Sequence, residues 1–444
     1  MKIKNDVKKK SSKKEFTIRD ALLTTRFENS DDGRTIYNIF VVIFVLLLTY
    51  TGLDEYTKTG EVWLSLHLLW FAFKKLYLAI LVWCASNIVA CFSYAFFKFW
   101  AKVRLILKPK GQNVWDKIWI TILVFYYFWF LYGLQNIGNV AKFGKASTTF
   151  VFMEQVRLLM KQHAFIRTNV PRVLRTKMHT DTNLELPNFG KFLYFMFAPT
   201  MIYRDEYPRT RHIRWKFVFY NIWELFAVTW FYAIIVERFL ISTFDDMCLR
   251  KFTWGEIISP IFGNVLPGIL FLLLSFYGVL HSCQNAFAEI LRFGDRMYYK
   301  EWWNSKSLGE FHRTWNMLVQ DWLYTYVYKD VYEVIVPKNK KVANFVVLFL
   351  SAVVHEWLVI NVFRFFLPVN LIIFLITGAV FAAMGIMGAQ WGNLLFLYGM
   401  AIGLSIEANL FALESYAHDN CPLNENVTAM KFYIPRFIAC RCIK

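Results

Sequence analysis

Long apolar runs separated by short polar segments are the main feature of this chain. Five runs contain no Asp, Glu, Lys or Arg and are 18 to 42 residues long: 36–53, 76–97, 118–141, 257–288 and 365–406. A helix needs about 20 apolar residues to cross a bilayer, so the last run is long enough for two crossings. Lipid offers no hydrogen bonds to the backbone, and we therefore expect helices in all of these runs.

Three further segments have the length of a membrane span but carry ionisable side chains. Residues 217–236 contain Glu224, and residues 342–363 contain His355 and Glu356. Residues 317–336 are a weaker candidate, because four charged side chains interrupt them. Together these patterns predict an all-α polytopic membrane protein with about nine transmembrane helices.

Residues 152–166 show the spacing of an amphipathic helix. Apolar side chains recur every three or four positions, whereas Glu154, Arg157 and Lys161 fall on the opposite side. This pattern fits a helix that lies in the membrane interface, and it fits an ordinary surface helix equally well. Residues 289–304 mix aromatic and charged side chains and are expected to form an interfacial helix and turn.

The composition supports a membrane protein. Of the 444 residues, 57% are hydrophobic and 18% are charged, against about 25% charged in soluble domains. This excludes intrinsic disorder and argues against a single soluble globule. The net charge of +18 is explained by basic cytosolic segments, so we expect no nucleic-acid partner. Residues 1–34 hold ten basic and six acidic side chains and are predicted to be a short, mobile cytosolic tail near anionic headgroups.

The seven cysteines suggest no metal site, because no paired CxxC motif occurs. Four of them lie in or beside apolar segments and read as small core residues, and the other three cluster near the C-terminus. An odd number of crossings would place that end in the lumen, where a disulfide is chemically permitted. Asn426, in the same tail, begins a possible glycosylation sequon.

His355 is the most conspicuous candidate for chemistry. An ionisable group inside a span usually faces the protein interior or a cavity. We expect burial to keep its imidazole neutral, and a neutral imidazole is a suitable general base. The alternative is a structural histidine that hydrogen-bonds a neighbouring helix. Glu356 points about 100° away on a helix and is not an obvious orienting partner.

A second polar group occurs in residues 311–328. Asn316 and Gln320 share one helix face, and they could line a polar tunnel or merely join helices. The chain has no HExxH motif, P-loop, nucleophile elbow or GxGxxG motif, and no credible Ser or Cys nucleophile stands beside a His. This argues for direct transfer between two bound substrates, without a metal and without a covalent enzyme intermediate.

Several motifs together carry a family resemblance. The stretch YYKEWWN contains Tyr298, Tyr299, Glu301, Trp302, Trp303 and Asn304, and it is followed by RTWN at 313–316, SAVVHE at 351–356 and CPL at 421–423. With FAPTMIYRDEYPR at 197–209, their order and spacing resemble those of the sterol O-acyltransferases of the membrane-bound O-acyltransferase (MBOAT) superfamily.

The resemblance implies an MBOAT fold in the endoplasmic reticulum membrane. It implies transfer of a long-chain fatty acyl group from acyl-CoA to the 3-hydroxyl of a sterol, which forms a steryl ester for storage. Acyl-CoA is then a substrate, and no cofactor is expected. The resemblance also implies a homodimer or homotetramer and a disulfide between Cys421 and Cys440. The predicted organisation is a tail (1–34), a transmembrane catalytic domain (35–414) and a luminal tail (415–444).

The resemblance also assigns roles to residues. His355 matches the catalytic histidine and Asn316 its partner, while the positions that contact CoA and the acyl chain match Arg313, Trp315, Tyr328, Lys340 and Ser351. Gln320 stands where the family commonly has a histidine. Glutamine donates hydrogen bonds but does not accept a proton at neutral pH, so we expect Gln320 to position substrate.

Two alternatives remain. Diacylglycerol or another lipid alcohol could be the acceptor, since acceptor identity depends on pocket shape. A transporter could instead line its pathway with His355, Asn316 and Glu224, although the chain lacks the internal repeat that such proteins show. Lys338, Lys340 and Lys341 could meet CoA phosphates, or they could simply follow from cytosolic topology.

Overall fold

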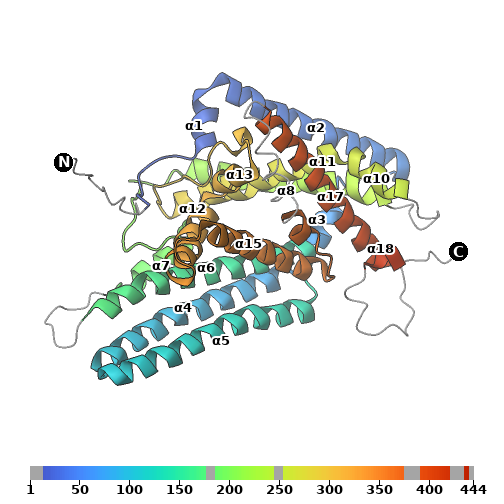
Figure 1. The fold of residues 1–444 in the computed structure, drawn as a ribbon. Helices are drawn as coiled ribbons and strands as arrows, with labels where there is room; N and C mark the ends of the chain where they lie inside the picture. The colour runs from blue at the N-terminus through green and yellow to red at the C-terminus, as the bar shows by residue number, and fades with distance from the viewer. Residues whose placement is uncertain (1–13, 177–185, 245–253, 375–390, 421–434, 440–444) are drawn as a thin grey trace, which may run out of the picture.

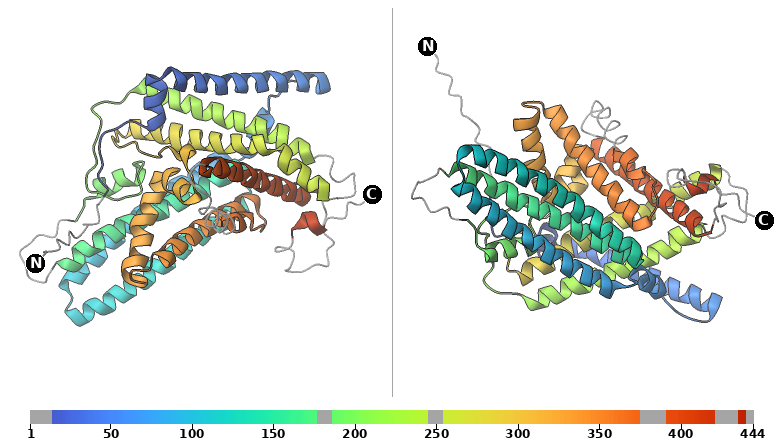
Figure 2. Two further views of the ribbon diagram at one scale, coloured as in Figure 1. Left: turned by 45° about the horizontal axis from the view of Figure 1, so that its top comes forward. Right: turned by 90° about the horizontal axis from the view of Figure 1, so that it is seen from below.

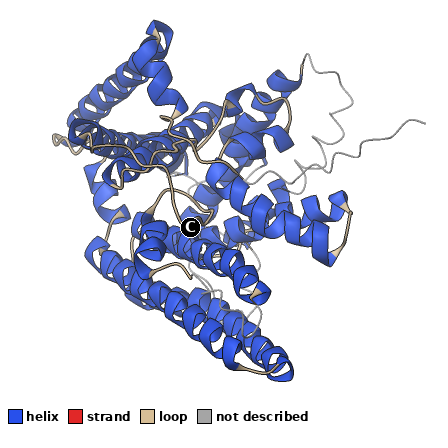
Figure 3. Cartoon of the chain, turned by 90° about the vertical axis from the view of Figure 1, so that its left-hand side faces the viewer, coloured by secondary structure: helices blue, strands red, loops and turns tan. Residues whose placement is uncertain are grey.

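The computed structural model describes residues 14–176, 186–244, 254–374, 391–420 and 435–439. These ranges are helical and contain no β-strand, as Figure 3 shows; two isolated backbone bridges join Arg19 to Asp295 and Arg209 to Phe293. The all-α fold expected from the apolar runs is therefore confirmed for the described part of the chain.

The helices of the first half of the chain are long and mostly uninterrupted. They are α1 (Leu22–Asn29), α2 (Asp31–Thr59), α3 (Leu66–Ala72), α4 (Leu76–Ile106), α5 (Pro109–Ala141), α6 (Lys145–Arg175), α7 (Phe189–Phe197) and α8 (Trp215–Ile235).

The helices of the second half are shorter, and several continue as π-helical turns. They are η1 (Val236–Ile241), α9 (Ser242–Phe244), α10 (Trp254–Gly263), α11 (Val265–Ser275), η3 (Phe276–Cys283), α12 (Gln284–Ile290), the 3-10 turn η4 (Trp302–Asn304), α13 (Leu308–Thr314), α14 (Met317–Trp322), η5 (Leu323–Tyr328), η6 (Val331–Ile335), α15 (Lys340–Phe363), α17 (Gly392–Asn420) and α18 (Arg436–Ala439).

Seven helices or helix combinations are long and apolar enough to cross a membrane. They are Asp31–Thr59, Leu66–Ile106, Pro109–Gly133, Trp215–Phe244, Val265–Ile290, Lys340–Phe363 and Gly392–Asn420. Each coincides with a predicted span. Of the two other predicted crossings, one involves residues 375–390, which lie outside the described residues, and 317–336 is helical but not apolar enough to qualify. The chain is a multi-pass membrane protein.

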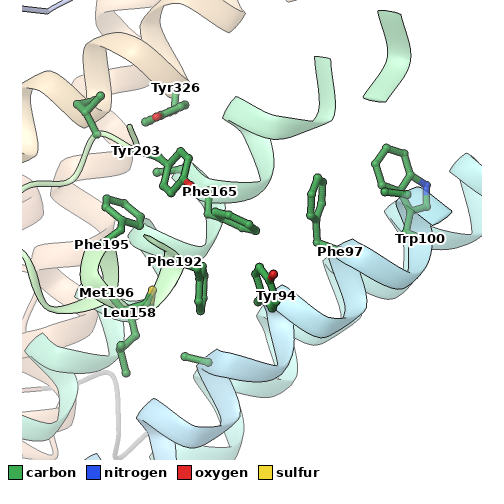
Figure 4. Packing of buried hydrophobic residues seen from close by; sticks show 14 of the residues in the cluster. Tyr94, Phe97, Trp100, Leu158, Phe165, Phe192, Phe195, Met196, Tyr203 and Tyr326 are labelled. Atoms are coloured by element: carbon green, nitrogen blue, oxygen red, sulfur yellow. The ribbon is translucent and has the colours of Figure 1, made fainter. Parts of the chain in front are cut away.

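The helices form two groups with α15 between them (Figure 1). Helices α4, α5 and α6 run side by side, and α2, α8 and α11 lie on the other side of the molecule; the further views in Figure 2 show the same arrangement. Helix α15 packs against α6 and against η5 and η6. The largest aromatic cluster joins α4, α6 and α7 through Tyr94, Phe97, Phe165, Phe192 and Phe195 (Figure 4).

Helix α6 differs from its sequence-based interpretation. Its buried face includes Phe152, Leu158 and Phe165, but it also includes Lys161, whereas Met153 is exposed. The prediction that Lys161 lies on an outer polar face is therefore wrong. The Nζ atom of Lys161 donates to the backbone oxygens of Phe195 and Ala198, both at 2.6 Å. The lysine thus caps the end of α7 inside the protein.

The N-terminal segment makes polar contacts with the body of the protein from residue 14 onward. Lys14 Nζ lies 2.5 Å from Asp321 Oδ2, and Arg19 forms a two-point ion pair with Asp295. The predicted borders at 34/35 and 414/415 fall inside α2 and α17. Residues 31–34 and 415–420 are therefore helical, as parts of α2 and α17.

Candidate active site

Helix α15 presents His355 in a defined tautomer. The helix begins after Asn339, whose Oδ1 accepts from the backbone N–H of Val342 at 3.1 Å, and it ends before Arg364 in the left-handed conformation. The Nδ1 atom of His355 lies 2.7 Å from the carbonyl oxygen of Ser351, one turn earlier. A carbonyl only accepts, so Nδ1 carries the proton and Nε2 keeps its lone pair. The backbone thus prepares His355 to act as a base through Nε2.

The His355 side chain is exposed among the described residues, which contradicts the expectation of burial. Its ring packs against Phe374, with centroids 5.2 Å apart. The neighbouring Glu356 is buried and accepts from the backbone N–H of Leu371 at 3.1 Å. Glu356 therefore points away from the imidazole, as expected, and the ring is open to a substrate.

Asn316 lies at a break between α13 and α14. Its Oδ1 accepts from the N–H of Val319 at 3.2 Å and caps α14. Within the described part of the chain its Nδ2 makes no hydrogen bond, and the side chain is half-buried. The cap fixes the amide in one orientation and leaves two N–H donors for a ligand.

The YYKEWWN segment braces this break from both sides. The N–H of Lys300 donates to the carbonyl of Thr314, and the N–H of Met317 donates to the carbonyl of Tyr298, each at 2.8 Å. Trp315 and Asn316 lie between these two bonds. The backbone of the motif therefore holds the two residues that precede α14.

The aromatic side chains of the motif add packing to these bonds. The ring of Trp302 is buried and lies 4.8 Å from that of Trp315, which Phe311 and Phe276 also contact at 5.2 and 5.3 Å. Tyr299 is buried and its hydroxyl lies 2.6 Å from Nδ1 of His281. Burial and packing of these rings stabilise this region.

The remaining side chains of the motif serve as anchors. Tyr298 is fully buried, and its hydroxyl donates to the carbonyl of Gln284 at 3.4 Å. Glu301 pairs with Arg26 of α1 and accepts from Asn304 Nδ2 at 3.0 Å, while Trp303 lies under the Arg26 guanidinium at 5.9 Å. The motif acts here as a structural brace that links α1 to the Asn316 break.

The predicted CoA-contacting residues lie on or directly after α13, on η5 and on the first half of α15. Tyr324, Tyr328 and Tyr332 stack in a ladder with centroids 5.5 and 5.8 Å apart, on the turns that pack against α15. Lys340 is exposed at the start of α15, and Arg313 is exposed at the end of α13. Neither cation forms an ion pair with the rest of the described chain.

Ser351 and Gln320 occupy places near these groups. The Ser351 hydroxyl lies 3.5 Å from Nδ1 of His355, and its carbonyl orients the ring. Gln320 is half-buried, its backbone N–H donates to the Asn316 carbonyl at 3.0 Å, and its side chain has no hydrogen-bond partner in the described ranges.

Glu224 belongs to a different cluster. It is buried in α8, where it accepts from the hydroxyls of Tyr277 at 2.6 Å and Ser282 at 3.1 Å. Where the structure is described, Glu224 has no contact with His355 or Asn316. Its contacts therefore form a separate polar cluster, and they do not support the shared pathway that the transporter alternative requires.

Sequence reasoning missed His312, one turn of chain before Asn316. Its ring stacks on Phe374 with centroids 5.7 Å apart, and Phe374 also contacts His355. The only sequence signal was its spacing of four residues from Asn316. That signal is weak, because the sequence does not show that Phe374, which follows α15, contacts both His312 and His355.

Metal ligands are not assembled in the described ranges: no group of three or more His, Cys, Asp or Glu side chains could hold an ion there. The predicted disulfide lies outside the described residues, since Cys421 and Cys440 are both in undescribed segments, as is Asn426.

Known proteins resemble this chain over nearly its whole length. Sterol O-acyltransferase 1 of Mus musculus is 35% identical over 439 residues, which cover 96% of this chain and 79% of that protein. Sterol O-acyltransferase 2 of Homo sapiens is 33% identical, covering 96% of this chain and 80% of that protein. The model of the membrane-bound O-acyltransferase family, MBOAT, matches residues 35–412. The chain is a member of the membrane-bound O-acyltransferase family.

Proposed function

We propose that this protein is a sterol O-acyltransferase that moves a long-chain acyl group from acyl-CoA to the 3-hydroxyl of a sterol. The observation that carries the proposal is the tautomer of His355, whose Nδ1 is held by the Ser351 carbonyl at 2.7 Å while Nε2 has no hydrogen-bond partner among the described residues. The similarity to sterol O-acyltransferases 1 and 2 over 96% of the chain supports the choice of acceptor.

The reaction follows from the two polar groups. His355 Nε2 accepts the proton of the sterol hydroxyl while the hydroxyl oxygen attacks the thioester carbon. The carbon–sulfur bond then breaks, the ester forms, and the imidazolium returns the proton to the CoA thiolate. Asn316 Nδ2 donates to the carbonyl oxygen as it gains charge. General-base catalysis contributes typically ~10²–10⁴-fold, and one oxyanion donor ~10²–10³-fold.

Recognition of CoA is assigned to the start of α15 and the tyrosine ladder. Lys338, Lys340 and Lys341 are exposed there and provide positive charge for phosphates. Tyr328 lies in the middle of the ladder and offers an aromatic face to the nucleotide or the pantetheine chain. The acyl chain and the sterol are apolar, so both reach the site from the bilayer.

The location and assembly proposed here are those that the family resemblance implies. We place it in the endoplasmic reticulum membrane as a homodimer or homotetramer, with the N-terminal segment in the cytosol. Residues 14–34 are rich in polar contacts to the body of the protein, which is consistent with an aqueous side rather than with lipid.

The test is an acceptor competition with purified protein in lipid nanodiscs. Labelled oleoyl-CoA is offered with equimolar cholesterol, diacylglycerol and a long-chain alcohol, and the esters are separated. We expect steryl ester to dominate. His355→Ala should abolish transfer, whereas His212→Ala, at an exposed loop position, should keep it. Predominant diacylglycerol acylation would reassign the acceptor, and near-normal turnover by His355→Ala would refute the assigned chemistry.

A further inference from the structure

His312 shares an aromatic wall with His355. It lies on α13, and its ring is 5.6 Å from Phe311 and 5.7 Å from Phe374, stacked on the latter. Phe374 in turn lies 5.2 Å from the ring of His355 on α15. The two imidazoles therefore flank the same phenylalanine, although 43 residues separate them in sequence (355 − 312).

The Nε2 atom of His312 is buried and has no hydrogen-bond partner in the ranges that the structure describes. Leaving a buried polar atom unpaired costs about 1–3 kcal/mol, and such atoms are rare in folded proteins. When one occurs beside a site that must bind polar atoms of a substrate, a ligand is the natural partner. His312 thus has an open hydrogen-bonding position next to the base.

The charge state of His312 suits such a role. Burial, together with the nearby His355, lowers the pKa of the His312 imidazole to about 4. The ring is therefore neutral near pH 7, with one N–H donor and one lone pair. A neutral donor stabilises a developing negative oxygen without the desolvation cost of a buried cation.

Only one polar atom of the reacting groups remains for this donor to bind. His355 Nε2 takes the hydroxyl proton, so the remaining polar atom at the reaction centre is the carbonyl oxygen of the thioester. Asn316 lies four residues after His312 at the same α13–α14 junction, and its side-chain N–H groups have no partner among the described residues. We propose that His312 is a second hydrogen-bond donor to the acyl carbonyl oxygen, acting beside Asn316 in the transition state. This inference rests on the proposed acyl transfer.

The competing explanation is that His312 only fills space between Phe311 and Phe374. The two explanations differ for variants that keep the shape and lose the donor. His312→Phe retains the aromatic packing and removes both nitrogens, whereas His312→Gln retains an N–H donor and loses the ring. His212→Phe repeats the same replacement at an exposed loop position and serves as the matched control.

The experiment measures kcat and KM for acyl-CoA and sterol in the parent, His312→Phe, His312→Gln and His212→Phe. It also measures how tightly each protein binds an unreactive thioether analogue of acyl-CoA that lacks the carbonyl. We expect His312→Phe to lower kcat ~10²-fold, with both KM values and the analogue affinity within about threefold of the parent. His312→Gln should recover part of the loss. A kcat for His312→Phe within about threefold of the parent would show a packing role and overturn the inference.

Two further outcomes are distinguishable. If His312→Phe does not fold, His312→Leu is compared with His312→Gln, and equal kcat values in these two overturn the inference. If the parent itself transfers no acyl group to any alcohol while still binding the thioether analogue, the proposed function fails, and that result does not depend on His312.

Discussion

Single buried polar side chains join helices that are far apart in sequence. Lys161 is the clearest case, with 1% of its surface exposed and both of its hydrogen bonds directed at carbonyls near the end of α7. The last carbonyls of a helix have no partner within the helix. Burial, and to a smaller extent Arg157, lowers the pKa of Lys161 well below its usual value. The amine works here as a local cap rather than as a surface charge.

Replacing Lys161 with Met should therefore destabilise the protein. Met matches the length of the side chain but leaves the Phe195 and Ala198 carbonyls unpaired, at about 1–3 kcal/mol for each buried group. We expect a clear fall in the thermal midpoint in detergent. Lys191→Met is the control, because its amine reaches only an exposed carboxylate at 3.4 Å; an equal fall in both variants would contradict the capping role.

His312 should make stability depend on pH. Its pKa is about 4 in the folded protein and about 6.5 in an unfolded chain. The unfolded state therefore binds the proton at higher pH, and stability falls as pH drops from about 6.5 towards 4. The full effect is roughly 3 kcal/mol.

Thermal midpoints between pH 7.5 and 4.5 test this effect. The parent should lose more stability on acidification than His312→Phe, which cannot take up the proton. Burial also lowers the pKa of His163, but that contribution is present in both proteins and cancels in the comparison. Parallel pH curves would contradict a buried neutral His312.

At the scale of elements, the break between α13 and α14 decides how Asn316 is presented. On one side of the break, the Lys300 N–H donates to the Thr314 carbonyl, and on the other side the Tyr298 carbonyl accepts from the Met317 N–H. Between them, Asn316 has extended backbone angles, with φ −131° and ψ 91°. These angles lie outside the α region, which is the region that a following proline disfavours. Met317 is the first residue of α14, where the N–H has no partner within the helix.

Met317→Pro consequently removes one hydrogen bond without breaking a helix. Proline is accepted at the first helical position, so the substitution deletes the donor to Tyr298 and little else of the backbone. We expect kcat to fall about fivefold or more below that of Met317→Ala, which controls for the lost side chain, because a hydrogen bond contributes about 1 kcal/mol. Equal kcat values would mean that the brace does not position Asn316.

Sequence patterns predicted the helices that cross the membrane. The seven described spans coincide with apolar runs because length and apolarity are properties of the run itself. The buried side of α6 was misjudged because the partners of Lys161 come from residues 195 and 198, which no periodicity indicates. His312 was missed for the same reason, since its neighbour Phe374 follows α15. Tertiary partners, rather than local patterns, decide such positions.

At the scale of the whole molecule, apolar side chains cover much of the outside. In each of Asp31–Thr59 and Pro109–Gly133, only 6% of the apolar stretch that is long enough to cross a bilayer is buried inside the protein. Water would not tolerate such surfaces, so lipid covers them, and the polar contacts concentrate inside. The N-terminal segment belongs to these polar contacts: Arg19 bonds to Asp295 through its side chain and exchanges backbone hydrogen bonds with Gly294 and Arg296.

The Arg19–Asp295 pair should therefore respond asymmetrically to mutation. The Asp295 side chain is 1% exposed, whereas that of Arg19 is 35% exposed. Arg19→Gln leaves a buried carboxylate without its counter-ion, and removing one partner of a buried pair costs about 3–5 kcal/mol. Asp295→Asn leaves a cation that can still reach water, so its effect should be smaller.

A double-mutant cycle separates this pairing from general damage. Arg19→Gln should lower the thermal midpoint more than Asp295→Asn, and combining the two should recover part of the loss, since the double mutant buries no charge. Lys58→Gln is the control, because that lysine is 70% exposed in its pair with Asp54 and exposed pairs contribute little. A double mutant as unstable as the sum of the singles would mean that residue 19 does not act through Asp295.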